Sequence, residues 1–324
     1  MYKKPEMASW TGRVDDGLDP AAFRYHQRIR FIEKSVDDSE YTKTFCLVGF
    51  ECDEGVRLNH GKAGAAIAPL YIKQALAKLP CHFGQDIGIV DAGSIACLNG
   101  QLEEAQKELA VFCSSIYSKK CIPVIIGGGH ETVFGHYLAV RNAIGPDESL
   151  GIINLDAHFD LRPYHNGPSS GTMFNQILDQ DPNCSYMAIG IQKHGNTPSL
   201  FHSAKEAGCT YILEEEIAHH DGLASCLEKM TEFSSKHTYV ILTICMDVLN
   251  ASSAPGVSAP SPFGLSPYTL RALVKHAVGF TNCCSFDICE VNPQTDESNR
   301  TVQLAAYILA EGLTSFKGHG FSGM

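Results

Sequence analysis

The sequence predicts an α/β protein, a three-layer α/β/α sandwich whose central, mostly parallel sheet has about eight strands. Two observations predict it. Short apolar runs recur along the chain, and amphipathic segments of helical period lie between them. Most of the runs are continuously apolar, which is typical of strands that helices cover on both faces. A closed (β/α)₈ barrel shows the same alternation and is the main alternative.

The predicted strands are separated by stretches long enough for one helix each. This alternation favours parallel neighbours, because a parallel strand can return to the sheet only through a crossover connection. The apolar runs lie at residues 44–50, 87–91, 123–126, 151–155, 186–191, 210–213, 239–246 and 285–291.

Three segments carry helix signals. Residues 101–118 place apolar side chains at steps of three and four, which forms one stripe on a helix. Ser266 and Pro267 indicate another helix start, because a hydroxyl at the N-cap and a proline in the first turn both suit that position. Residues 21–33 look helical within a polar N-terminal stretch. We therefore expect residues 1–40 to form an arm or helix that packs on a single domain of residues 41–324.

Composition and charge limit the classes of partner. The 324 residues are 44% hydrophobic and 19% charged, as in an ordinary folded protein. The net charge of −11 argues against a nucleic acid or an anionic membrane as partner, since both require basic surface. An anionic substrate stays open, because the charge inside a cleft can oppose the net charge.

The cysteines and the N-terminus bear on the cellular compartment. The 13 cysteines are odd in number and contain no C-x-x-C, so we expect reduced thiols. The first ten residues hold no apolar stretch of the kind found in signal peptides. No apolar run reaches the roughly 18 residues of a membrane span. These features predict a cytoplasmic protein.

Ionisable side chains gather where four of the predicted strands end, which is where parallel α/β sheets bind ligands. Three glycines and His130 follow the third run. Asp156, His158 and Asp160 follow the fourth at steps of two, so in extended chain they share one face. Cys245 and Asp247 repeat this spacing, and Glu290 ends the last run before Asn-Pro.

Each of these segments also has a plainer interpretation. The glycines could form a turn whose His130 caps a helix, and Cys245 could be a small buried apolar residue. Asp247 could cap a helix, and Glu290 could pair with a cation inside the protein. Taken together, however, several acids at apolar strand ends are costly unless a cation compensates their charge.

The combined set of imidazoles and carboxylates suits Mn²⁺, Fe²⁺ or Zn²⁺. The ligands are too many for one ion and fit two ions that share bridging carboxylates. Two such ions, about 3.5–4 Å apart, activate a water molecule for attack. The sequence thus predicts a two-metal hydrolase.

These motifs resemble those of the arginase (ureohydrolase) superfamily. Gly-Gly-Gly-His-Glu, Asp-Ala-His-Phe-Asp, the paired ligands before Val248 and the late Glu-Val-Asn-Pro follow the family's order from about residue 45 onward. Within the superfamily the chain is most similar to the formimidoylglutamases, on Trp10–Asp15, Ser170-Gly171-Thr172 and the loop over residues 254–260.

The resemblance implies the three-layer fold and two Mn²⁺ ions per subunit. It implies hydrolysis of N-formimidoyl-L-glutamate to L-glutamate and formamide, a step of histidine degradation, by a hydroxide bound to both ions. One ion would be held by His130, Asp156 and Asp160. The other ion would be held by His158 and Asp247, and Asp156 and the residue at 245 would bridge the two ions.

Two positions depart from the arginase pattern. Cys245 stands where arginases have Asp, and a thiolate is softer than the oxygen ligands that suit Mn²⁺. Phe174 stands near the place of a histidine that moves protons in arginases, which counts against arginase activity.

The remaining expectations concern the substrate. Glu290 and His158 would be catalytic, with Glu290 also binding the amidinium group of a small amidine that carries carboxylates. Arg162, Asn166 and Asn196 are the candidates for binding those carboxylates. The alternatives are another ureohydrolase (agmatinase, guanidinobutyrase or arginase) or a non-catalytic relative, and a homo-oligomer is left open.

Overall fold

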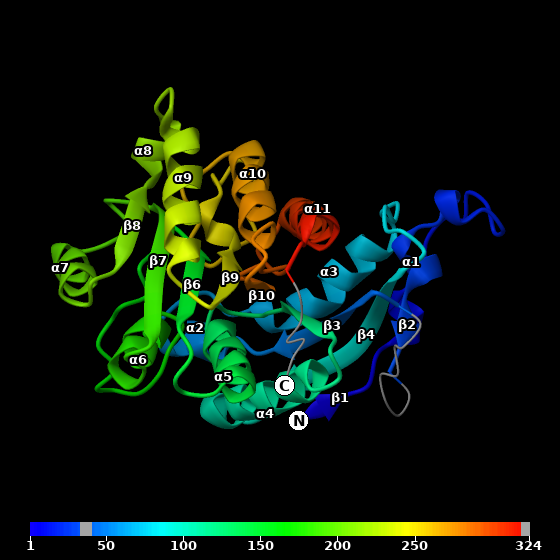
Figure 1. Cartoon of the computed structure of the whole chain (residues 1–324), viewed down its shortest axis with the longest axis horizontal. Helices are drawn as coiled ribbons and strands as arrows, with labels where there is room; N and C mark the ends of the chain where they lie inside the picture. The colour runs from blue at the N-terminus through cyan, green and yellow to red at the C-terminus, as the bar shows by residue number, and fades with distance from the viewer. Residues whose placement is uncertain (33–40, 319–324) are drawn as a thin grey trace.

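One sheet of ten strands organises the chain. The computed structural model describes residues 1–32 and 41–318. In this part the strand order is β1-β4-β3-β5-β10-β9-β6-β7-β8, with β2 beside β4 (Figure 1). All pairings are parallel except that of β1 with β4. The strands are β1 Tyr2–Lys3, β2 Arg30–Phe31, β3 Lys43–Glu51, β4 Ile87–Ala96, β5 Ile122–Ile126, β6 Leu150–Leu155, β7 Cys184–Ile191, β8 Thr210–Leu213, β9 Tyr239–Cys245 and β10 Cys283–Cys289.

The eight strands predicted from apolar runs are all present as β3 to β10. Strands β5, β6 and β10 are buried along their whole length, which explains why their sequences show no polar alternation. Strands β1 and β2 were not predicted, because each has two residues and no periodicity can be read from so few. The sheet ends at β1 and β8, so the barrel alternative is wrong.

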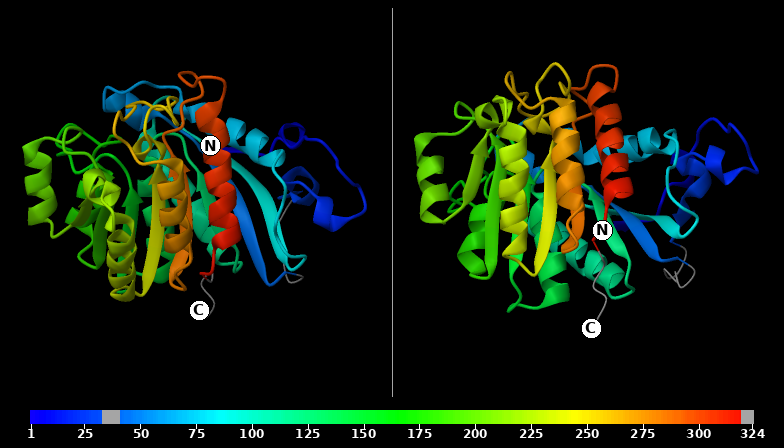
Figure 2. Two further views of the ribbon diagram at one scale, coloured as in Figure 1. Left: turned by 90° about the horizontal axis from the view of Figure 1, so that it is seen from above. Right: turned by 45° about the horizontal axis from the view of Figure 1, so that its top comes forward.

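Helices cover both faces of the sheet and complete the predicted three layers. One apolar cluster joins α3, α9, α10 and α11 to the first face, and a second joins α4, α5 and α6 to the other (Figures 1 and 2). Neighbouring strand residues divide between the clusters, as Val124 and Ile125 do. The helices are α1 Tyr25–Arg28, α2 Glu54–Leu58, α3 Ala68–Ala77, α4 Leu102–Tyr117, α5 Thr132–Ile144, α6 Met173–Gln180, α7 Pro198–Glu206, α8 Glu214–Ala218, α9 Gly222–Ser235, α10 Pro267–Val278 and α11 Arg300–Ser315.

Two of the three predicted helices are confirmed. Helix α4 covers the predicted stripe, and its first turn carries Glu103 and Glu104, which suit the positive end of a helix dipole. Helix α10 begins as expected, because the Ser266 hydroxyl oxygen accepts a hydrogen bond from the Thr269 amide and Pro267 follows in the first turn. Among the described helices, none combines the length and the apolar character that crossing a membrane requires.

The helix predicted over residues 21–33 is wrong. The chain forms a short 3₁₀ turn at Pro20–Ala22 and the single turn of α1, and then extends into β2. Strand β2 pairs with β4 instead of continuing the helix, so tertiary pairing overrides the local pattern. Trp10, Tyr25 and Ile29 of this region belong to the first apolar cluster. The domain boundary proposed at residue 40 lies outside the described residues and stays a prediction.

Candidate metal centre

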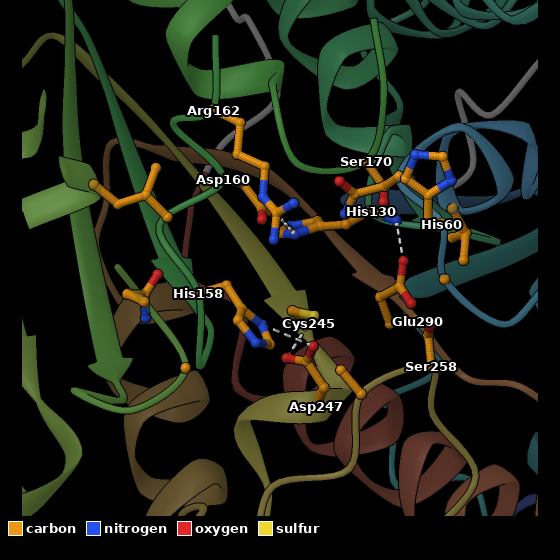
Figure 3. Close-up of a pocket in the computed structure, with 17 residues that line it drawn as sticks. His60, His130, His158, Asp160, Arg162, Ser170, Cys245, Asp247, Ser258 and Glu290 are labelled. Carbon is orange, nitrogen blue, oxygen red and sulfur yellow. Dashed lines mark hydrogen bonds and ion pairs between the residues drawn. The ribbon is translucent and has the colours of Figure 1, made fainter. Parts of the chain in front are cut away.

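The predicted metal ligands lie at or after the ends of β5, β9 and β6, and the predicted catalytic residue Glu290 follows β10; these four strands lie side by side in the sheet, in the order β5, β10, β9, β6. Since these strands are parallel, their carboxyl ends meet at one edge. His130, Asp160, Cys245, Asp247 and Glu290 all line one pocket at that edge, together with His158 (Figure 3). The structure thus brings the residues singled out in the sequence to one place.

The glycines after β5 explain how His130 reaches the pocket. The amide of Gly129 donates to the Cys52 carbonyl over 2.8 Å, and the amide of Glu290 donates to the Gly128 carbonyl over 2.8 Å. A side chain at Gly128 would place its Cβ only 1.9 Å from the Cys52 oxygen. Only glycine permits this close approach between the loops that follow β3, β5 and β10.

His130 faces two carboxylates. Its Nδ1 lies 3.0 Å from Asp156 Oδ2 and 3.0 Å from Asp160 Oδ2. Asp160 reaches this position with a positive φ of 49°, a backbone conformation that residues other than glycine rarely adopt. Ligand atoms of His130, Asp156 and Cys245 all lie within 4.8 Å of one another, as close as one ion requires.

A second group shares Asp156 with the first. His158 Nδ1 lies 3.1 Å from Asp247 Oδ2 and 3.5 Å from Asp156 Oδ1. Atoms of Asp156, His158 and Asp247 also fall within 4.8 Å of one another. Asp156 therefore stands between two groups, with a different oxygen toward each. This is the arrangement expected of a carboxylate that bridges two ions.

The charges of these buried groups do not balance. Burial, together with the negative charge of Asp156, raises the pKa of Asp160 to about 6. Burial and neighbouring carboxylates also raise the pKa of Asp247 and Glu290. Burial opposes the ionisation of Asp156, but hydrogen bonds from His130 and His158 hold its pKa well below the usual range. Two imidazoles cannot neutralise four carboxyl groups, and divalent cations would supply the missing positive charge.

Cys245 lies where the family pattern places an acid. Burial raises the pKa of its thiol well above the usual value, and the charges of Asp156 and Asp247 raise it further. The protonated thiol donates to Asp247 Oδ1 over 2.9 Å. In this state Cys245 holds a carboxylate in place, and it can bind an ion only after losing its proton.

The substrate side of the pocket holds Glu290 and Arg162. Glu290 is 5% exposed and has a positive φ of 67°, and its Oε1 accepts a hydrogen bond from the His130 amide over 2.7 Å. Arg162 is exposed, lines the same pocket and extends toward His130 (Figure 3). The pocket thus places one acid and one guanidinium near the two histidines.

Two other substrate candidates lie differently. Asn196 lines the pocket, but its side chain accepts from the Phe159 amide and donates to the carbonyls of Ala157 and Gln192. These bonds occupy its polar atoms, so Asn196 fixes the loop that carries His158. Asn166 lies in an exposed turn, outside the set of residues that line the pocket. A turn asparagine is the plainer interpretation of Asn166.

Three further residues line the pocket from loops and were not predicted individually: His60, Ser170 and Ser258. Loops carry no periodicity, so only the resemblance over residues 170–172 and 254–260 pointed to this region.

Residues 167–171 have the Gly-x-Ser-x-Gly spacing of serine hydrolases. In that motif a strand leads directly into the turn, but here β6 ends at Leu155 and no strand leads directly into residues 167–171.

Comparison with known proteins agrees with this geometry. The model of the arginase family matches residues 43–314. A formimidoylglutamase of Geobacillus thermodenitrificans is 51% identical over 317 residues, which cover 98% of this chain and 98% of the relative. One from Clostridium tetani is 40% identical over 95% of this chain and 94% of its own.

Solved structures share the fold. The crystal structure of a formimidoylglutamase from Bacillus subtilis superposes with a TM-score of 0.79 at 24% identity, covering 86% of this chain and 89% of that one. A Trypanosoma cruzi formiminoglutamase solved with Mn²⁺ gives 0.77 at 24% identity, covering 87% of this chain and 96% of that one. At these identities the likeness concerns the fold alone.

Proposed function

The chain belongs to the arginase family, and from this membership we propose that it hydrolyses N-formimidoyl-L-glutamate to L-glutamate and formamide. It is a hydrolase of C–N bonds in amidines. The observation that supports the proposed substrate is that Glu290 and Arg162 line the same pocket. Such a pocket suits a substrate with a cationic amidinium at one end and carboxylates at the other.

We propose that His130, Asp156 and Asp160 hold one manganese ion and that His158 and Asp247 hold a second, with Asp156 shared. The first group fits this role, because His130 Nδ1 lies 3.0 Å from a carboxylate oxygen of both Asp156 and Asp160. The second group fits as well, because the ligand atoms of Asp156, His158 and Asp247 lie within 4.8 Å of one another. In each group the carboxylates outnumber the imidazoles. When bound, two such ions supply a hydroxide at neutral pH and stabilise the negative charge that develops after attack. Cys245 would support Asp247 through its thiol proton.

Glu290 is proposed to orient the amidinium. The His130 amide already binds its Oε1, which leaves the second oxygen for an N–H group of the substrate. An ionised Glu290 and a cationic amidinium form a charge-assisted hydrogen bond in a buried site. This bond would hold the amidine carbon in the near-attack geometry that hydrolysis requires.

Arg162 is proposed to bind a substrate carboxylate. Its backbone amide donates to the Gly171 carbonyl over 2.9 Å, so the loop after β6 and the loop before α6 hold it at the pocket mouth. Agmatine is a cation without a carboxylate, so the positive charge of Arg162 would repel it. Arg57, a further cation near the pocket, already pairs with Glu54 and is 62% exposed.

Phe174 separates this site from the arginase pattern. Its ring is fully buried, stacks on Tyr186 with centroids 4.1 Å apart, and meets His130 edge to face. A phenyl ring can neither donate nor accept a proton. The amine product must therefore take its proton from another group or from solvent, which favours a substrate other than arginine.

We also propose a cytoplasmic location. All thirteen cysteines are free thiols, and most are buried. Free thiols in this number suit a reducing compartment.

A substrate panel tests the proposal. The protein, reconstituted with Mn²⁺, should release formamide from formimidoylglutamate and little urea from agmatine, guanidinobutyrate or arginine. Arg162→Ala should raise the KM for formimidoylglutamate roughly tenfold or more, the loss expected of one charged hydrogen bond. Arg57→Ala is the matched control and should leave KM unchanged. Urea release as the main activity, or an unchanged KM in Arg162→Ala, would refute the substrate assignment.

A further inference from the structure

A row of buried polar side chains runs from His130 through the sheet to the helices behind it. Thr243 lies on β9, Asp287 lies beside it on β10 as its register partner, and His136 lies on α5. All three are 0% exposed. The mechanism above uses none of them, although burying three polar groups is costly unless their hydrogen bonds are satisfied.

The hydrogen bonds of Thr243 determine which nitrogen of His130 carries a proton. The Thr243 hydroxyl donates to Asp287 Oδ1 over 2.7 Å, and this uses its only proton. His130 Nε2 lies 3.0 Å from the same hydroxyl oxygen, which can then only accept. Nε2 must therefore be the donor. A neutral His130 ring consequently presents an unprotonated Nδ1, the atom that faces Asp156 and Asp160.

The far side of Asp287 is fixed in the same way. His136 Nδ1 lies 2.7 Å from Asp287 Oδ2. The Tyr117 hydroxyl donates to Ser285 Oγ over 2.6 Å, which directs the Ser285 proton to His136 Nε2. His136 Nδ1–H then donates to Asp287, so donors reach both oxygens of this carboxylate. Asp287 cannot turn away from Thr243 without breaking the bonds on its other side.

We propose that Asp287, acting through Thr243, is a positioning residue that holds the His130 ring in the Nδ1-binding tautomer for one of the two metal ions. This inference rests on the proposed function. Its effect is confined to the ion held by His130, Asp156 and Asp160. Thr243 and Asp287 make no hydrogen bond to His158 or Asp247 among the bonds of the described residues.

Thr243→Val tests the proposal, because valine keeps the shape of threonine and removes the oxygen that receives Nε2–H. The free Mn²⁺ signal in electron paramagnetic resonance, measured during titration of the metal-free protein, gives the number and strength of the sites. Wild-type protein should show two ions. Thr243→Val should weaken one site about 10- to 100-fold, the usual effect of removing a partner of a metal-bound histidine, and leave the other unchanged.

Two further variants separate positioning from packing. Thr243→Ser keeps the hydroxyl and should restore the weakened site. Asp287→Asn keeps the size but cannot accept hydrogen bonds from both sides through two oxygens, so it should weaken the same site as Thr243→Val. Thermal unfolding of each metal-free variant shows whether it folds, and a variant that fails to fold is replaced in the comparison by the other.

The outcomes are distinct. Two wild-type sites in Thr243→Val, equal losses at both sites, or no recovery in Thr243→Ser would overturn the positioning role. A wild-type protein that binds two ions but hydrolyses none of the panel would overturn the proposed substrate and leave the positioning role standing. A wild-type protein that binds no manganese would overturn both.

Discussion

Replacing Glu290 with glutamine tests the proposed contact with the amidinium most directly. The amide oxygen of glutamine can still accept the hydrogen bond from the His130 amide, so the loop keeps its anchor. At the position proposed for the substrate, the change replaces a negatively charged oxygen with an NH2 group, so it removes both the charge and the hydrogen-bond acceptor. The fold and the metal ligands are left as they are.

The size of the effect follows from burial. Glu290 is 5% exposed, so water screens its charge little. A hydrogen bond to a charged group contributes about 1.5–3 kcal/mol. At about 1.4 kcal/mol for each factor of ten, Glu290→Gln should lower kcat/KM for formimidoylglutamate roughly 10- to 150-fold.

The assay is formamide release at several substrate concentrations, with manganese counted on the same samples. The variant should still bind two ions, because Glu290 is not among the proposed ligands. Glu311→Gln is the control, since Glu311 pairs with Arg271 and Lys275 on α10. A variant with two ions and wild-type kcat/KM would show that Glu290 does not contact the amidinium.

Four further predictions concern the metal centre. Removing manganese with a chelator should lower Tm, since an ion present at a hundredfold its Kd stabilises the folded state by about 2.7 kcal/mol, and an unchanged Tm would argue against tight binding. Manganese affinity should fall as pH drops through about 6, where the Asp160 carboxylate takes up a competing proton, and a flat titration would contradict this. Folding raises the pKa of Asp160, so its stabilising contribution is present below its unfolded pKa and is lost as pH rises through about 6. At neutral pH, metal-free Asp160→Asn should therefore have a higher Tm than metal-free wild type. A lower Tm would refute the charge argument. Cys245→Asp should raise manganese affinity in calorimetry, because a carboxylate is a harder ligand than a thiol, and an equal affinity would place residue 245 outside the ligand set.

The fold was largely predictable because parallel strands buried on both faces leave a signal that needs no tertiary knowledge. Ile125 and Ile126 are apolar neighbours that face opposite layers, and each layer demands an apolar residue. The short strand β2 could not be predicted, since only its pairing with β4 makes Arg30 and Phe31 extended.

Some residues of the site could likewise be predicted from the sequence and others could not. Asp156, His158 and Asp160 were found because their spacing lies within one strand end. Asp287 was not, because its partners Thr243 and His136 come from β9 and α5, and only the register of the folded sheet brings them together. Nor does spacing say whether a polar atom is already occupied, which is why Asn196 looked available in the sequence.

The left-handed backbone at Asp160 and Glu290 lowers the stability of the fold at two residues that the proposed reaction needs. An L-residue there costs about 1–2 kcal/mol that glycine would not, and both carboxyl groups are also buried among like charges. Glycine at either place should relax the chain while removing a group that the reaction needs. Selection on the stability of the metal-free chain alone would therefore favour a more stable protein without activity, and only selection on turnover would retain these two acids.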